Sequence, residues 1–272
     1  MLQLFSDKKN LVTLSYFLFH LYGIIKYSEY LLSWKLYSKG GTCSWEIIKD
    51  RPGRINHFVI KYFSLLLTNN AFFSITALSF LIHGILIFNI SYTVPFFFWL
   101  FLICAQLIIS FRNRYDGIAA DYLYTILVLP LGLLNSFRND NIIETICMSF
   151  IAIQTVIAYF TAGIVKLLTI HWRNGSALPK ILNMELSLLK PLALFLHQHK
   201  LVSQVISFIL IVLLMSVPVV IFLPTIFVVA VLFLLLLFHI LNLFILHINQ
   251  FIFAFLATYP AILYLHHLIW NR

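Results

Sequence analysis

The residues best suited to chemistry lie at the end of an apolar run, in the stretch "YFTAGIVKLLTIHWRNGSAL". Four of them are spaced i, i+3, i+4 and i+7 and so share one face of a helix: Tyr159, Ala162, Gly163 and Lys166. Small residues on that face allow another helix backbone to approach closely. A lysine placed there can act as a general base, or it can be an ordinary cation that extends to the membrane surface. Spacing alone leaves both interpretations open.

A second set of polar residues occurs in "FHILNLFILH". His239 and Asn242 are three residues apart on one helical face, and His247 falls in the same broad stripe. These side chains can hydrogen-bond a polar ligand or a neighbouring helix. Because no cysteine or carboxylate stands nearby at ligand spacing, we predict hydrogen bonding here and no metal site.

Asp121 lies about one turn inside the apolar stretch that follows Arg112. An ionisable residue inside a membrane span costs about 2.5 to 3.5 kcal/mol, which makes it a candidate for binding a ligand or partner. An acid near a helix N-terminus also gains about 0.3 to 1 kcal/mol from the helix dipole. Ligand binding and helix capping both remain open for Asp121.

Other titratable residues are expected to have structural roles. Lys26 and Glu29 are three residues apart, so they can pair on one helical face. His20 and His83 are single histidines on apolar helices, and we expect each to be hydrogen-bonded. Two histidines near the end of the last span are expected to extend to the interface: His266 and His267.

The composition indicates the class of protein in which these residues are positioned. Of 272 residues, 62% are apolar and 10% are charged, and the mean hydropathy is +0.98. Soluble domains carry about 25% charged residues. The apolar runs are long and continuous, unlike the alternating strands of a membrane barrel. We therefore predict an all-α integral membrane protein.

Windows of about 20 apolar residues predict a bundle of about eight transmembrane helices. The predicted spans are 11–33, 71–90, 95–111, 118–137, 142–168, 203–222, 225–246 and 249–269. Pro224 marks the hairpin between the sixth and seventh spans. The segments 34–70 and 169–202 mix Lys, Trp and Tyr with Leu and Phe, so we expect them to lie in the interface. The whole chain, 1–272, is expected to form a single transmembrane domain.

The net charge of +9 indicates anionic lipids rather than nucleic acid, because the basic residues stand singly at the ends of apolar runs. Lys8 and Lys9 precede the first apolar segment without a cleavage pattern, which favours an uncleaved first span. The positive-inside rule places the long connections in the cytoplasm. Three cysteines predict neither a disulfide framework nor a metal site: Cys43, Cys104 and Cys147.

These stretches resemble a known family. The run from Tyr159 to Leu178 is similar to the Y-F-x-A-G-x-x-K-L and W-x-x-G pattern of the vitamin K-dependent gamma-carboxylase membrane domain. Its bacterial relatives are the horizontally transferred transmembrane (HTTM) domain proteins. "FHILNLFILHINQFIFAFLATYP" resembles the F-H-x-x-N, F-x-x-x-x-L-A and P pattern, and "RNRYDGIAADYLYTILVLPLGLL" resembles a third pattern of bacterial members. The three stretches lie in family order within 112–260.

The resemblance implies roles for individual residues. Lys166 stands where the family has the base that deprotonates a reduced quinone, and His239 stands in the polar pair of a later helix. The other residues that the resemblance places around a pocket for a quinol, lipid or peptide are Tyr159, Asp121, Asn242, Arg112 and Trp172. The carboxylase has a large extramembrane portion, whereas this chain ends at Arg272, and Val165 stands where the carboxylase has a second lysine. The resemblance therefore implies quinone chemistry more directly than glutamate carboxylation.

The family also includes small bacterial proteins similar to sporulation-delaying protein B, which act in the maturation of exported peptide toxins. The alternative is therefore a non-enzymatic partner for a secreted peptide. A transporter is a third hypothesis, which the absence of a visible internal repeat disfavours. The bacterial members imply a multi-pass protein of the bacterial inner membrane, with the polar face outside the cytoplasm. The charge count gives the opposite orientation.

Overall fold

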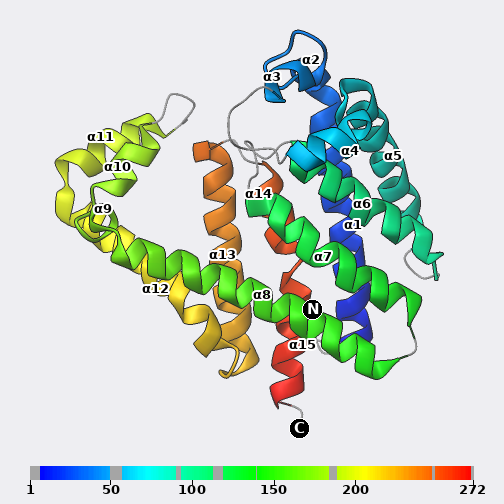
Figure 1. Cartoon of the computed structure of the whole chain (residues 1–272). Coiled ribbons are helices and arrows are strands. Elements are labelled where there is room, and N and C mark those ends of the chain that lie inside the picture. The colour runs from blue at the N-terminus through cyan, green and yellow to red at the C-terminus, as the bar shows by residue number, and fades with distance from the viewer. Residues whose placement is uncertain are drawn as a thin grey trace. The chain divides into compact units, whose positions relative to one another are not determined.

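The computed structural model describes residues 7–49, 57–89, 93–112, 119–138, 140–183, 189–246 and 249–270. Within these ranges every regular element is a helix and no strand occurs (Figure 1). The all-α prediction is confirmed. The chain divides into two compact units, and each is described by itself. We call Thr13–Cys147 the N-terminal unit, and Met148–Arg272 with Met1–Val12 the C-terminal unit.

The N-terminal unit is built around three long helices that pack in chain order. α6 packs on α7 and on α5, and the short α4 packs on both α5 and α6. Rings fill the core, where Phe19 stacks on Trp99 with centroids 6.0 Å apart. The helices of this unit are α1 (Lys8–Leu32, from Thr13 onward), α2 (Trp34–Tyr37), α3 (Trp45–Ile48), α4 (His57–Leu67), α5 (Asn69–Phe88), α6 (Phe96–Arg112), α7 (Ala119–Ser136) and the start of α8 (Asn141–Leu168).

The C-terminal unit combines long apolar helices with an arm of three short ones (Figure 1). In this arm α10 packs on α11, and both contact α12. α12 ends at Val220 and α13 begins at Thr225, so the hairpin predicted at Pro224 is confirmed. The helices after α8 are α9 (Ile170–Arg173), α10 (Ala177–Leu182), α11 (Lys190–Gln198), α12 (Lys200–Val220), α13 (Thr225–Leu246), α14 (Asn249–Leu256) and α15 (Tyr259–Trp270).

Five segments of the described chain are long and apolar enough to cross a membrane, fewer than the eight predicted. They are Asn69–Phe88, Asn141–Leu168, Lys200–Val220, Thr225–Ile245 and Asn249–Trp270. The other predicted spans also form helices, α1, α6 and α7, which are shorter or more polar. The last segment is interrupted, because α14 ends at Leu256 and α15 begins at Tyr259. This break was not predicted.

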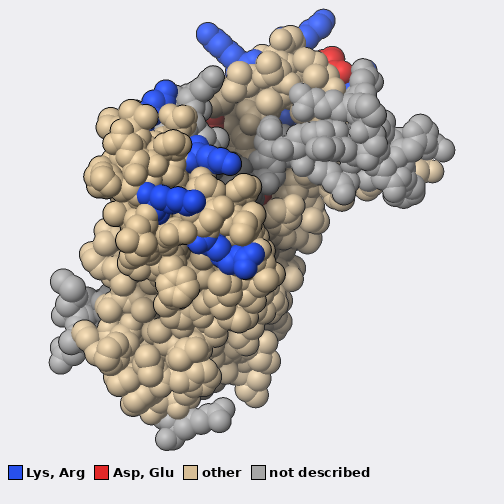
Figure 2. Space-filling view, turned by 90° about the vertical axis from the view of Figure 1, so that its left-hand side faces the viewer, with Lys and Arg blue, Asp and Glu red and all other residues tan. Residues whose placement is uncertain are grey.

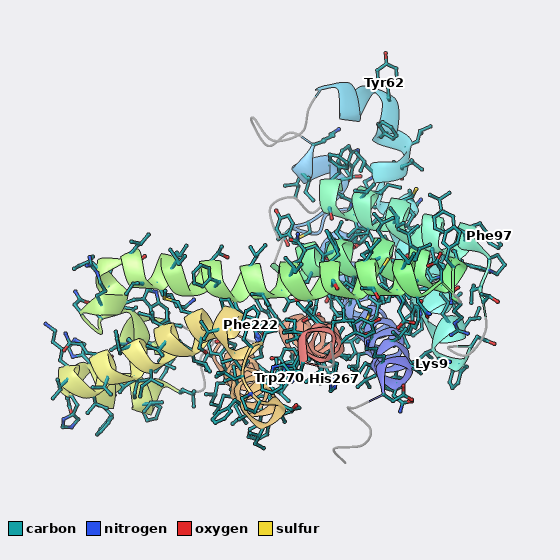
Figure 3. All side chains as sticks on the ribbon, turned by 90° about the horizontal axis from the view of Figure 1, so that it is seen from below. Lys9, Tyr62, Phe97, Phe222, His267 and Trp270 are labelled. Atoms are coloured by element: carbon teal, nitrogen blue, oxygen red, sulfur yellow. The ribbon has the colours of Figure 1, made fainter. Side chains whose placement is uncertain are left out.

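The connecting segments form short helices. Residues 34–70 contain α2, α3 and α4, and residues 169–202 contain the arm α9–α11. In the described chain neither segment holds a helix that meets the requirements for a span. Exposed apolar side chains surround the long helices, as expected of surfaces that face lipid. Tyr62, on α4, points away from its helix in Figure 3, and Phe97 and Phe222 are also exposed.

Candidate functional site

Three helices of the C-terminal unit meet in a buried hydrogen-bonded group. The hydroxyl of Tyr159, on α8, lies 2.8 Å from Nε2 of His239, on α13. The same hydroxyl lies 3.0 Å from the hydroxyl of Tyr259, the first residue of α15. All three side chains are buried. The break between α14 and α15 therefore sets a tyrosine hydroxyl next to the predicted site.

The imidazole of His239 packs on an aromatic ring, and one of its nitrogens makes no hydrogen bond with the described residues. Its imidazole stacks on Phe255 with centroids 4.2 Å apart and 19° between the planes. Nδ1 is buried, and among the described residues it has no hydrogen-bond partner. Buried polar atoms nearly always have a partner, so an exception calls for an explanation. An unpaired imidazole nitrogen of this kind can bind a polar atom of a ligand.

Lys166 lies two turns after Tyr159 on α8 and contacts a different ring. Its side chain is half-buried, and its ammonium lies 5.2 Å from the centre of the Trp172 ring. A cation at this distance is attracted to the face of an indole ring. The structure thus brings together two pairs of predicted residues, Tyr159 with His239 and Lys166 with Trp172.

The small-residue face of α8 is in close contact with α12, as predicted. A Cβ added to Gly163 would lie 2.6 Å from Cγ of Met215 and 3.2 Å from its backbone nitrogen. Only a glycine fits at this separation without a shift of the neighbouring side chain. Asn242 lies three residues after His239 on α13 and is half-buried, while His247 falls outside the described residues.

In the N-terminal unit, Asp121 forms a buried ion pair. Its Oδ1 lies 2.6 Å from Nζ of Lys26, which is fully buried. The same ammonium donates to Oε1 of Gln106 at 2.6 Å and lies 4.2 Å from the centre of the Tyr124 ring. The sequence had suggested Glu29, on the same helix, as the partner of Lys26; the structure gives Lys26 a partner on α7. This arrangement supports a structural role for Asp121.

The two histidines expected to be structural are hydrogen-bonded to each other, which confirms that interpretation. Nδ1 of His20 lies 2.9 Å from Nδ1 of His83, whose Nε2 lies 2.7 Å from the hydroxyl of Tyr124. A Cβ at Gly23 would come 2.4 Å from the His83 ring, so the glycine makes room for it. The prediction that His266 and His267 extend to the interface was wrong, because both side chains are buried. Nδ1 of His266 lies 2.8 Å from the carbonyl oxygen of Ile221.

Arg112 binds backbone rather than lining a pocket. Its Nε donates to the carbonyl of Leu67 at 3.1 Å. Its Nη2 donates to the carbonyls of Tyr37 and Cys43 and, at 2.8 Å, to Oδ1 of Asn69. A buried guanidinium with these acceptors fixes the start of α5 and the segment between α2 and α3 to the end of α6.

Asn69 connects this arginine to Glu46. Nδ2 of Asn69 donates to the Glu46 carboxylate at 2.9 Å. The backbone N–H of Glu46 and the Asn69 amide, both of which donate to the carboxylate, lower the pKa of Glu46. The group is exposed, so the network acts mainly to order the segment around α3.

Two residues of these sites were not predicted from the sequence. Tyr259 was quoted within a motif but carried no role, and only the helix break before it brings it to Tyr159. Gln106 stands inside an apolar run, where a buried amide is a recognisable signal. Its Nε2 also donates to the backbone carbonyl of Asp121 at 3.2 Å and so ties α6 to α7.

The predicted site residues fall in two different units. The C-terminal unit contains Lys166, His239, Tyr159, Asn242 and Trp172, and the N-terminal unit contains Asp121 and Arg112. Asp121 and Arg112 interact with residues of their own unit, although Nη1 of Arg112 is buried and has no hydrogen-bond partner among the described residues. The C-terminal unit therefore holds the candidate functional site. No family model, no curated protein and no solved structure matches the chain.

Proposed function

We propose that the chain is a multi-pass membrane enzyme whose C-terminal unit removes a proton from a hydroxyl group of an apolar substrate, such as a quinol. One observation carries the proposal: His239 uses Nε2 to hold the Tyr159 hydroxyl and keeps a buried, unpartnered Nδ1. A hydroxyl or carbonyl oxygen on the ligand would complete this site. The resemblance of the surrounding motifs to the carboxylase-like HTTM family supports the same reaction class.

Lys166 is the base in this proposal. It is half-buried near the end of α8, and the Trp172 ring beside it offers a flat surface on which an aromatic substrate can stack. The neutral amine of Lys166 takes the proton of the substrate hydroxyl and becomes an ammonium, while the substrate becomes an anionic quinolate. The positive charge then stabilises the new anion.

The same proposal includes the number of spans and the location. α1, α6 and α7 cross the bilayer together with the five apolar segments, which gives eight spans in the cell membrane, as in the resembled bacterial proteins. A reduced quinone is the proposed cofactor or substrate. Its apolar body would enter from the lipid, where such molecules concentrate.

The test is the protonation state of a bound quinol. The purified chain in lipid nanodiscs is mixed without oxygen with a reduced short-chain naphthoquinone, at a pH well below the pKa of the free quinol. We expect the ultraviolet spectrum of the bound quinolate with the wild-type protein and its loss with Lys166→Met. Lys190→Met, which removes an exposed lysine of the same unit, is the matched control. An equal quinolate signal from Lys166→Met would remove the lysine from the reaction.

A further inference from the structure

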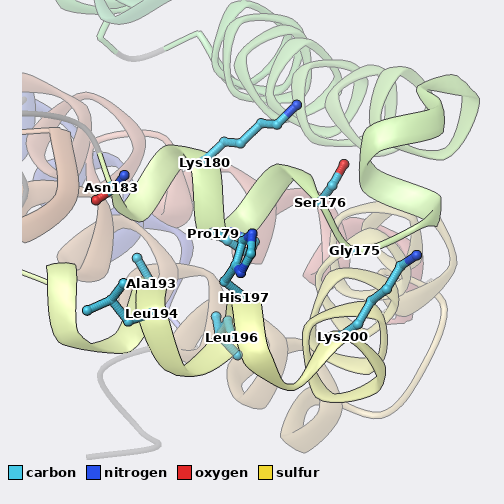
Figure 4. Close-up of a pocket in the computed structure, with 10 residues that line it drawn as sticks. All are labelled: Gly175, Ser176, Pro179, Lys180, Asn183, Ala193, Leu194, Leu196, His197 and Lys200. Atoms are coloured by element: carbon cyan, nitrogen blue, oxygen red, sulfur yellow. The ribbon is translucent and has the colours of Figure 1, made fainter.

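The arm of the C-terminal unit encloses a cavity of about 420 Å³ between α10, α11 and the start of α12. This volume falls within the range of about 300 to 1,000 Å³ that is usual for small-molecule sites. It is distinct from the Tyr159–His239 group, and no step of the proton-transfer proposal uses it. Its polar lining residues are Ser176, Lys180, Asn183, His197 and Lys200 (Figure 4).

The lining combines cations with apolar side chains. Lys180 extends from α10 and Lys200 from the start of α12, and Ser176 lies between them in the view of Figure 4. The apolar part of the lining includes Ala193 and Leu196, which are buried. A ligand that fits both kinds of side chain carries a negative charge at one end and an apolar portion at the other.

The described residues that line the cavity include two lysines and no acid. The lining contains no Asp or Glu, and in the sequence from 145 to 272 the only acidic residue is Glu185, which lies outside the described residues. Basic side chains gather over this part of the surface in the space-filling view (Figure 2). The arm contributes Arg173, Lys180 and Lys190, and the start of α12 adds Lys200. An anion at the cavity would therefore meet a positive field from these side chains.

The frame of the cavity is fixed without a ligand. Gly175 has a φ of +73°, and a Cβ there would come 2.7 Å from the backbone nitrogen of Gln204 on α12. The hydroxyl of Ser203 donates to the carbonyl of Gly175 at 2.5 Å. Leu182, Ala193 and Leu196 pack together and hold α10 to α11. Because the walls are tied both to α12 and to each other, binding need not order them.

The position of the cavity at the start of a candidate span indicates which class of ligand it binds. α12 is one of the five segments able to cross a membrane, and it begins at Lys200, in the cavity wall. The beginning of a span lies at the level of the lipid headgroups. We propose that this cavity binds the phosphate group of an anionic phospholipid, with the lysines on the phosphate and the acyl chains along the exposed apolar side chains of α11 and α12.

Native mass spectrometry of the full chain tests the site. The protein in detergent is titrated with phosphatidylglycerol, with phosphatidylcholine of the same acyl chains, and with inorganic phosphate. We expect phosphatidylglycerol to bind more tightly than phosphatidylcholine. The double variant Lys180→Gln/Lys200→Gln should weaken phosphatidylglycerol binding about tenfold or more, since each cation near an anionic headgroup contributes about a fivefold factor.

The matched control is Lys35→Gln/Lys39→Gln, which removes the same charge from exposed positions of the N-terminal unit. It should leave the affinity for phosphatidylglycerol unchanged. Equal losses of affinity in both double variants would show that only net charge matters, and would overturn the site. Equal affinity for the two lipids would also overturn it. Inorganic phosphate that displaces the lipid at millimolar concentration supports the phosphate contact. Phosphate that binds more tightly than the lipid would overturn the lipid assignment. Quinolate formation is measured separately, so either proposal can fail alone.

Discussion

The Tyr159 hydroxyl is the point where three helices of the C-terminal unit share one hydrogen-bonded group. It has two neighbours, the His239 imidazole at 2.8 Å and the Tyr259 hydroxyl at 3.0 Å. A hydroxyl can donate one hydrogen bond and accept others, so it can serve both neighbours at once. The arrangement fixes the orientation of the His239 ring, and it thereby determines where the unpaired Nδ1 points. In this site a tyrosine positions a histidine.

Replacing Tyr159 by phenylalanine should destabilise the C-terminal unit by about 1 to 3 kcal/mol, because two buried polar groups lose a partner while the ring volume is kept. Thermal unfolding of the purified protein in detergent measures the change. Tyr122→Phe removes a hydroxyl from an exposed tyrosine of α7 and should have little effect. If both variants unfold at the wild-type temperature, the buried group contributes nothing to stability.

At the scale of helices, each unit contains an interhelical contact that depends on particular residues. In the N-terminal unit the Lys26–Asp121 pair joins α1 to α7, and Gln106 brings α6 to the same point. In the C-terminal unit the backbone of α8 approaches α12 at Gly163. A buried charge is costly when alone and tolerable when paired, so the two partners must be considered together.

The Lys26–Asp121 pair predicts a non-additive double-mutant cycle. Lys26→Met leaves a buried carboxylate without its cation and should cost about 3 to 5 kcal/mol. Lys26→Met combined with Asp121→Leu removes both charges and should recover most of that loss. Chemical unfolding in mixed micelles gives the free energies, with Lys35→Met at an exposed position as the control. Additive losses would show that the two side chains do not interact.

Gly163 predicts a difference between two glycine-to-alanine substitutions. Gly163→Ala places a methyl group 2.6 Å from Cγ of Met215, so we expect a destabilisation of about 1 to 3 kcal/mol. Gly84→Ala, in α5, meets no atom within 4 Å and should stabilise the helix by about 0.5 to 1 kcal/mol. Thermal unfolding of both variants gives the comparison. A stabilised Gly163→Ala protein would mean that α12 does not approach α8 as closely as described.

For the whole molecule, the sequence predicts where helices form better than it predicts which residues meet. Apolar runs located a helix at every predicted span and the hairpin at Pro224, because local composition determines both. The partner of Lys26 lies 95 residues away on another helix, and spacing along one helix favoured Glu29. Tyr259 reaches the site only through the break after α14. Contacts of this kind depend on packing, which one-dimensional periodicity does not contain.

The number of spans is the prediction that concerns the whole chain. α1 has 25 residues, α6 has 17 and α7 has 18, all within the range of about 17 to 25 residues needed to cross a bilayer. Two of the charged residues on these helices, Lys26 and Asp121, pair with each other away from the surface. A charged pair buried between helices is compatible with helices that span the membrane, because the charges do not face lipid. We therefore expect all three helices to cross.

Reporter fusions at the two termini distinguish eight membrane spans from five. Eight spans place the N- and C-termini on the same side of the membrane, whereas the five apolar segments alone place them on opposite sides. A third reporter inserted at Pro224 serves as the internal control, since two spans, α13 and α14–α15, separate it from the C-terminus under either count. Termini on opposite sides, with Pro224 on the side of the C-terminus, would contradict eight spans. At least one of the helices α1, α6 and α7 would then not cross the membrane.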